Sequence, residues 1–89
     1  MSSVAVGGLL LERQAPRAAL AQFDAYLGSP RATSLIPEAL YGRARALERL
    51  GRDKHGDERA ERQTWDRLLA DFPDSAYAPL ARRRLSELK

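Results

Sequence analysis

The chain has 89 residues, no cysteine, and 15 basic against 12 acidic residues, which gives a formal net charge of +3 at neutral pH. This length accommodates one domain with a modest core, and the absence of cysteine excludes disulfides, thiolate metal sites and a catalytic cysteine while leaving the compartment open. A charge this small and this evenly mixed indicates solubility and at most a preference for acidic surfaces.

The N-terminal segment, residues 3–13, is expected to form a first helix because Val6, Leu9 and Leu10 recur at helical spacing. The apolar run within it, residues 4–11, is too short to span a bilayer. No basic residue precedes this run, as one would in a signal peptide. We therefore expect no leader and no membrane insertion by this segment, and the chain is typical of a piece excised from a longer protein.

Two helices are predicted to follow, over residues 16–27 and 37–50. Pro16 suits a first helical turn, and Gly28-Ser29-Pro30 ends the earlier helix. Gly51 is expected to end the later one, since glycine often follows the last helical residue. The apolar residues of 37–50 are predicted to face inward or to flank the inner face: Leu40, Ala44 and Leu47, then Ala39, Ala46 and Leu50.

Two further helices are predicted over residues 58–71 and 76–88, after a polar turn. The first has the clearest amphipathic stripe in the chain, at i, i+3, i+4 and i+7: Trp65, Leu68, Leu69 and Phe72. Pro73-Asp74-Ser75 should end it and cap the last helix. The last helix is expected to bury Tyr77, Ala81, Leu85 and Leu88. No segment alternates with the period of a strand, which predicts an all-α fold.

The order of large, small and aromatic residues in these helices resembles the tetratricopeptide repeat. Leu40 fills the large first-helix position, Ala44 the small one, and Leu50-Gly51 the helix end. Trp65 takes the second-helix aromatic position, and Pro73 ends the unit. In an earlier repeat the matching positions are Gly7, Leu10, Ala19 and Phe23. One departure is Glu61, which stands where the family has a small residue.

The ending Phe72-Pro73-Asp74-Ser75-Ala76-Tyr77-Ala78-Pro79 is similar to a signature of bacterial envelope repeat proteins, namely outer-membrane assembly lipoproteins and the helical C-terminal tails of anti-sigma regulators. The resemblance implies a right-handed α-solenoid of about two and a half helix pairs, that is, five helices in one domain. The repeats would cover residues 3–30 and 35–73, with a capping helix at 76–88. It also favours the bacterial periplasm or cell envelope, with the cytoplasm as the alternative.

Catalytic and metal-binding patterns are weak in this sequence. His55 lies in a polar turn between Asp53 and Asp57, a grouping that fits a solvated turn better than a metal or acid–base site. No Ser–His–Asp set or nucleophile elbow is present. The run Arg82-Arg83-Arg84 suggests nucleic acid, but consecutive helical residues point in different directions, so we expect a solvated face with one stem packed on the core. The sequence predicts neither an enzyme nor a bound cofactor.

Partner binding is the favoured function, as a non-catalytic protein–protein interaction module. The family resemblance implies a concave surface formed by first-helix side chains that point away from the core, which map here to Glu38, Tyr41, Arg45, Glu48 and Arg49. Tyr and Arg are common among residues that dominate binding energy. The alternative is a self-associating structural domain in which Val4, Val6 and Leu9 pair between copies. Nucleic-acid binding through the arginines ranks third.

Overall fold

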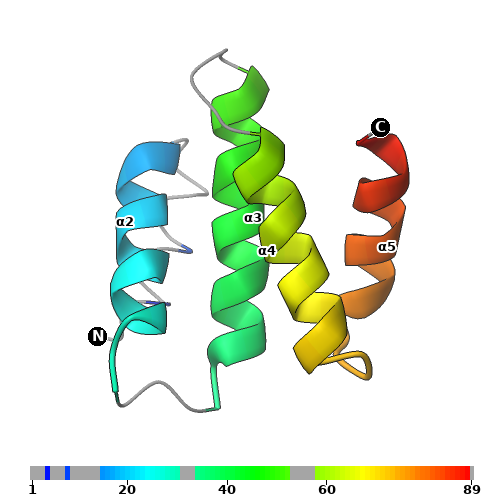
Figure 1. The fold of residues 1–89 in the computed structure, drawn as a ribbon. Coiled ribbons are helices and arrows are strands. Elements are labelled where there is room, and N and C mark those ends of the chain that lie inside the picture. The colour runs from blue at the N-terminus through cyan, green and yellow to red at the C-terminus, as the bar shows by residue number, and fades with distance from the viewer. Residues whose placement is uncertain (1–3, 5–7, 9–14, 31–33, 53–57, 89) are drawn as a thin grey trace.

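A computed structural model of the chain describes Val4, Gly8 and residues 15–30, 34–52 and 58–88. These residues contain no strand and form the helices α2 (Pro16–Leu27), α3 (Ile36–Arg52), α4 (Glu58–Asp71) and α5 (Ala78–Glu87). Consecutive helices run in alternating directions and follow one another across the molecule in chain order, with α4 in front of α3 (Figure 1). The all-α prediction is confirmed.

The helix boundaries agree closely with the sequence pattern. Helices α2 and α4 begin and end at the predicted residues, and α3 begins one residue before Pro37. The expectation that Gly51 ends α3 is wrong, because the helix continues to Arg52. The predicted first helix, residues 3–13, lies outside the described residues except for Val4 and Gly8, which have helical backbone. This N-terminal helix, which would bring the number of helices to five, therefore stays a prediction.

Helix α5 begins two residues later than predicted, because the preceding residues form turns. The backbone N–H of Tyr77 donates to Ser75 Oγ over 3.1 Å, and the N–H of Ala78 donates to the Ser75 carbonyl over 3.0 Å. Ser75 thus organises the turn before the helix instead of capping the helix itself. Pro79 lies in the first turn of α5, where its missing N–H costs little.

The core consists of two apolar clusters on either side of α3. The first joins α3, α4 and α5 and contains Leu40, Ala44, Trp65, Leu68, Ala78, Ala81 and Leu88. The second joins α2 and α3 and contains Ala19, Phe23, Ala39 and Ala46. Because α3 contributes to both clusters, it is the central helix of the described part. All six residues predicted for the inner face of this helix and its flanks are buried.

A close contact joins α2 to α3. Phe23 is 2% exposed, and its ring lies against Gly42, where an added Cβ would overlap the ring atoms. A glycine inside a helix costs about 1 kcal/mol relative to alanine, so its presence is explained by this contact. The sequence analysis missed Gly42, although a glycine in mid-helix was the available signal.

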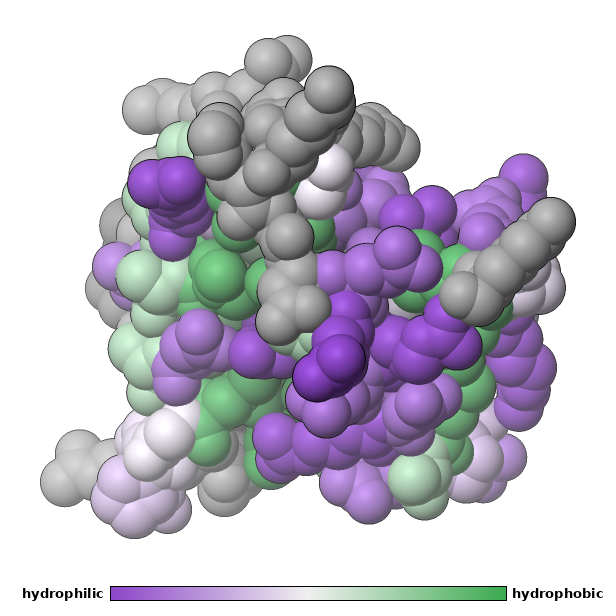
Figure 2. All heavy atoms as spheres, turned by 45° about the horizontal axis from the view of Figure 1, so that its top comes forward, coloured by the Kyte–Doolittle hydropathy of each residue, from purple (hydrophilic) through white to green (hydrophobic). Residues whose placement is uncertain are grey.

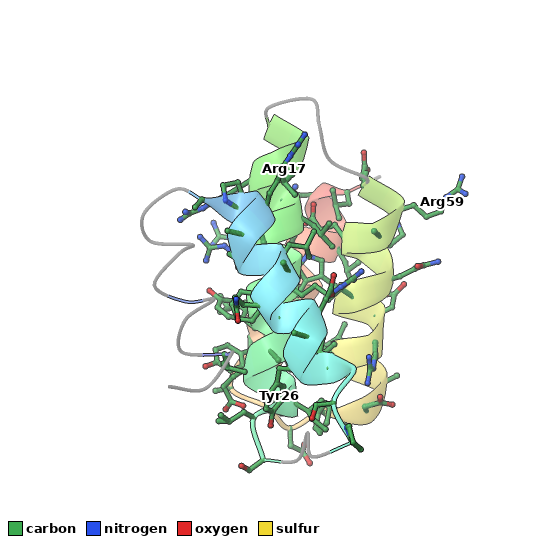
Figure 3. All side chains as sticks on the ribbon, turned by 90° about the vertical axis from the view of Figure 1, so that its left-hand side faces the viewer. Arg17, Tyr26 and Arg59 are labelled. Carbon is green, nitrogen blue, oxygen red and sulfur yellow. The ribbon has the colours of Figure 1, made fainter. Side chains whose placement is uncertain are left out.

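Polar contacts fix the order of the helices. Arg43 of α3 donates through Nε to Asp24 Oδ1 of α2 over 2.7 Å, and its Nη1 donates to the Thr64 hydroxyl of α4. At the end of α2 the Tyr26 hydroxyl accepts the backbone N–H of Leu35 over 3.2 Å, close to the segment that leads to α3 (Figure 3). These bonds tie α3 to both of its neighbours.

On the face that Figure 2 shows, the described surface is mostly hydrophilic over α4 and α5, and apolar residues gather toward α2. The outward residues of α5, among them Arg82 and Glu87, are exposed and polar. Pro79 and Leu80 are exposed apolar residues of the same helix, and 44% of Leu80 is exposed. None of the described helices combines the length and the apolarity that crossing a bilayer requires.

Candidate functional site

An open groove of about 250 Å³ runs between α3 and α5. Helix α3 contributes Tyr41, Arg45 and Glu48, which are three of the five predicted partner-binding residues. Trp65 of α4 also lines it, and Leu80 supplies an apolar side chain from α5. The remaining lining residues of α5 are Arg83, Arg84 and Glu87. The groove thus brings together residues that lie far apart in the sequence.

Aromatic rings form one wall of the groove. The Tyr41 ring stacks on the Tyr77 ring with centroids 4.4 Å apart and an interplanar angle of 16°. It also meets the Trp65 ring edge-on, with centroids 6.0 Å apart. The expectation that Tyr41 points away from the core is therefore wrong: its ring is half-buried and packs against the first cluster, because α5 covers that side of α3.

Arg45 lies next to this wall. Its Nη1 donates to the Tyr41 hydroxyl over 2.7 Å, and its guanidinium carbon is 5.7 Å from the Tyr41 ring centroid, within the range of a cation–π contact. Its Nε is buried and has no hydrogen-bond acceptor among the described residues. No carboxylate of the described part forms an ion pair with Arg45. The groove therefore contains a half-buried cation without an anionic partner in that part.

Arg84 is the centre of an ion-pair network. Its Nε lies 2.6 Å from Glu61 Oε2 and 3.2 Å from Glu48 Oε1, and its Nη1 lies 3.3 Å from Glu87 Oε1. The hydrogen bond to Glu61 outweighs partial burial and raises the pKa of Arg84 above its ordinary value. Arg84 therefore stays charged, and the two carboxylates that line the groove, those of Glu48 and Glu87, are both engaged with it.

Glu61, which stands where the resembled repeat has a small residue, is a buried carboxylate on α4. Its side chain is 3% exposed, yet it receives hydrogen bonds from Arg84 Nη2 over 3.2 Å and from Trp65 Nε1 over 2.9 Å, besides the Arg84 Nε contact. A buried carboxylate is tolerated only when it is paired and hydrogen-bonded. The sequence analysis identified Glu61 as unusual. Its partner Arg84 belongs to the run Arg82-Arg83-Arg84, in which one side chain was expected to pack on the core.

Glu38, in the first turn of α3, lines a second hollow of about 450 Å³. The walls of this hollow include the rings of Phe72 and Tyr77, with Asp71 and Asp74 nearby on the lining. Glu38 Oε2 is buried and receives no hydrogen bond within the described part. This predicted site residue is thus separated from the groove by the stacked tyrosine pair, because Tyr77 lines the second hollow and Tyr41 the groove.

Arg49 is the predicted site residue that lines neither the groove nor the second hollow. It is half-buried and interacts with another group of the protein. Glu48 likewise has a contact beyond its ion pair with Arg84. Of the five predicted residues, Tyr41 and Arg45 are therefore the two whose rings or charged groups shape the groove most directly.

The histidine turn, the other sequence candidate for chemistry, is not described by the structure. His55, Asp53 and Asp57 lie outside the described residues, and the described residues include no cluster of three or more side chains able to hold a metal ion. Arg62 donates to the Leu88 carbonyl over 2.7 Å.

The arginine run behaves as the sequence analysis expected. Arg82 and Arg83 are exposed, and Arg84 is the stem that packs inward. Comparison with protein-family models, with curated proteins and with solved structures found no match for this chain.

Proposed function

We propose that this chain is a non-catalytic protein-interaction module that binds a peptide segment of a partner protein in the groove between α3 and α5. The observation that carries the proposal is the chemistry of the groove: a half-exposed leucine, an aromatic wall and two arginines, Arg45 and Arg83, without carboxylate partners in the described part. Aromatic and arginine side chains beside an apolar anchor point are typical of surfaces that dominate binding energy.

The helix arrangement supports a solenoid of tetratricopeptide type. Helix α3 contacts α4, and α5 returns to meet both of them, through Tyr77 on Tyr41 and through Arg84 on Glu48 and Glu61. In such an array α3 and α5 are the first helices of successive repeats, and their shared surface is the concave one. Helices with a single apolar face hide it by stacking on neighbours, which is the physical basis of solenoids.

Binding fits the groove better than catalysis. Its charged groups in the described part are arginines and glutamates, and Arg84 pairs with both of the lining glutamates. No nucleophile stands beside a base in this lining, as acyl-transfer chemistry would need. We place the module in bacterial envelope signalling or assembly, on the resemblance of residues 72–79 to envelope repeat proteins, with the cytoplasm as the alternative compartment.

Self-association is the competing function. The residues expected to pair between copies begin with Val4, whose side chain packs against the cluster that contains Ala19 and Phe23. Val6 and Leu9 lie outside the described residues. At the opposite end of the array, the outward face of α5 is polar, and charged surfaces disfavour stacking of further copies. These observations favour a peptide occupant over a second copy.

The test is to select binders to the full chain from a library of random short peptides and to measure their affinity by fluorescence anisotropy. The variant Leu80→Glu places a charge on the apolar anchor without disturbing the core, since Leu80 is 44% exposed. Its matched control is Ala70→Glu, an exposed position on α4 away from the groove. Circular dichroism should show the same helix content in all three proteins.

We expect Leu80→Glu to weaken binding about tenfold or more and Ala70→Glu to leave it within about twofold. Equal affinity of both variants, or a library that yields no binder, would overturn the proposal. Sedimentation of the peptide-free chain adds a separate result. A dimer that Leu80→Glu converts to a monomer would show that the groove holds a second copy instead.

A further inference from the structure

Two buried side-chain atoms in the described part lack a hydrogen-bond partner, and both belong to α3. They are Glu38 Oε2 and Arg45 Nε. Residues 38, 41 and 45 are spaced i, i+3 and i+7, so they follow one stripe of the helix. Leaving a charged group without a full set of partners costs about 1–3 kcal/mol or more. Glu38 and Arg45 thus have incomplete hydrogen bonding and opposite charge on one stripe, and each side chain also lines a hollow that a ligand can enter.

The surroundings of the two atoms have opposite charge. Beside Glu38 the hollow is lined by Asp71, which forms an exposed ion pair with Arg67 over 3.6 Å, and by Asp74, for which the described part shows no ion pair. Beside Arg45 the groove is lined by exposed Arg83, while its two glutamates are engaged with Arg84. The lining of the hollow therefore has three carboxylates and no cation, whereas the lining of the groove has three arginines against two glutamates.

We infer that the segment bound on this surface carries a basic and an acidic side chain about 10 Å apart, with the basic one in the hollow of Glu38 and the acidic one at Arg45. The spacing follows from the helix, because seven residues at 1.5 Å each separate Glu38 from Arg45 by about 10 Å along its axis. The inference rests on the proposed function and adds the charge pattern and the polarity of the partner.

An extended segment suits this surface better than a helix. The Tyr41–Tyr77 stack divides the surface into two hollows of about 250 and 450 Å³, whereas a helix with its side chains is about 10 Å wide and needs one continuous trough. A chain in the polyproline II conformation advances about 9 Å in three residues and returns to the same face. The two charges should therefore lie three residues apart, across the tyrosine pair.

A charge-swap experiment tests the assignment. The probe is a synthetic peptide from the random library that binds the full chain and loses affinity for the Leu80→Glu variant. Two altered versions of this peptide are also made. In one its lysine or arginine is changed to glutamate, and in the other its acidic residue is changed to lysine. Each peptide is titrated against the unaltered chain, Glu38→Lys and Arg45→Glu. The controls Asp66→Lys and Arg82→Glu make the same changes in net charge at exposed positions outside both hollows.

We expect Glu38→Lys and Arg45→Glu each to weaken binding of the original peptide about tenfold or more, and the controls to leave it within about twofold. Arg45→Glu should regain affinity only with the peptide whose acid became lysine, and Glu38→Lys only with the peptide whose base became glutamate. Rescue in the opposite pairing, no rescue, or binders without both charges would overturn the inference. Loss of binding with Leu80→Glu would still support the peptide groove, so the two proposals fail separately.

Discussion

Arg84 of α5 forms an ion pair with the buried carboxylate of Glu61 on α4, with Arg84 Nε 2.6 Å from Glu61 Oε2. Trp65 donates to the same oxygen from one turn further along α4. The last helix is thus positioned by a charge pair as well as by apolar packing, and the same arginine also engages the glutamates beside the groove. The shape of the groove therefore depends in part on this contact between α4 and α5.

Truncating Arg84 should destabilise the domain strongly. Arg84→Ala leaves the Glu61 carboxylate buried without its cation, and breaking such a pair costs about 3 kcal/mol or more. The double variant Glu61→Leu, Arg84→Met removes both charges and should recover most of that loss. Urea unfolding followed by circular dichroism measures all three proteins. Equal stability of the single and double variants would contradict the role given to the pair.

The ion pair between Arg43 and Asp24 should contribute far less. The Asp24 side chain is 49% exposed and that of Arg43 is 28% exposed, so water screens both charges. We expect Asp24→Ala to lower the free energy of unfolding by at most about 1 kcal/mol, with a smaller effect at high salt. The same urea titration at two ionic strengths checks this. A loss as large as that of Arg84→Ala would show that exposure does not distinguish the two pairs.

Gly42 should not tolerate even one added carbon. A Cβ there would overlap the Phe23 ring, and overpacking of this kind costs about 1–3 kcal/mol. The matched variant is Gly51→Ala, in the same helix, where nothing lies within 4 Å of the added carbon. Alanine there should be neutral or stabilising by up to about 1 kcal/mol. The melting temperature should therefore fall for Gly42→Ala and stay the same or rise for Gly51→Ala, and equal changes in both variants would contradict the Phe23–Gly42 contact.

Trp65 provides an internal optical probe. It is the single tryptophan of the chain and is 1% exposed. Its fluorescence in the native protein should be blue-shifted relative to the urea-unfolded chain and resistant to quenching by acrylamide. Native emission like that of free tryptophan would show that the packing of α3, α4 and α5 around the indole does not persist in solution.

The sequence predicted the helices well where several local signals agreed. Pro16 and the glycine after Leu27 bound α2, and the Trp65 stripe defines α4, so both helices match their predicted ranges. Gly51 failed as a stop signal, because no turn forces a left-handed backbone there and the helix simply continues. Proline, glycine and the apolar stripes therefore located the ends of the described helices to within two residues.

The candidate site was predictable only in part. Spacing alone placed Tyr41 and Arg45 on one face of α3, and the structure brings both into the groove. Spacing could not show that α5 returns to cover Tyr41, nor that Leu80 and Arg83 form the opposite wall, since these contacts join residues about forty positions apart. The pairing of Glu61 with Arg84 was hidden for the same reason.

The most direct test of the groove is an NMR titration of the isotope-labelled full chain with a peptide selected from the random library. Backbone and indole shifts should move at Tyr41, Arg45, Trp65, Leu80 and Arg83 and stay unchanged at exposed α2 positions such as Arg17 and Ala21. Shifts that cluster on α2 or on the outward face of α4, with the α3–α5 surface unaffected, would contradict the groove as the binding site.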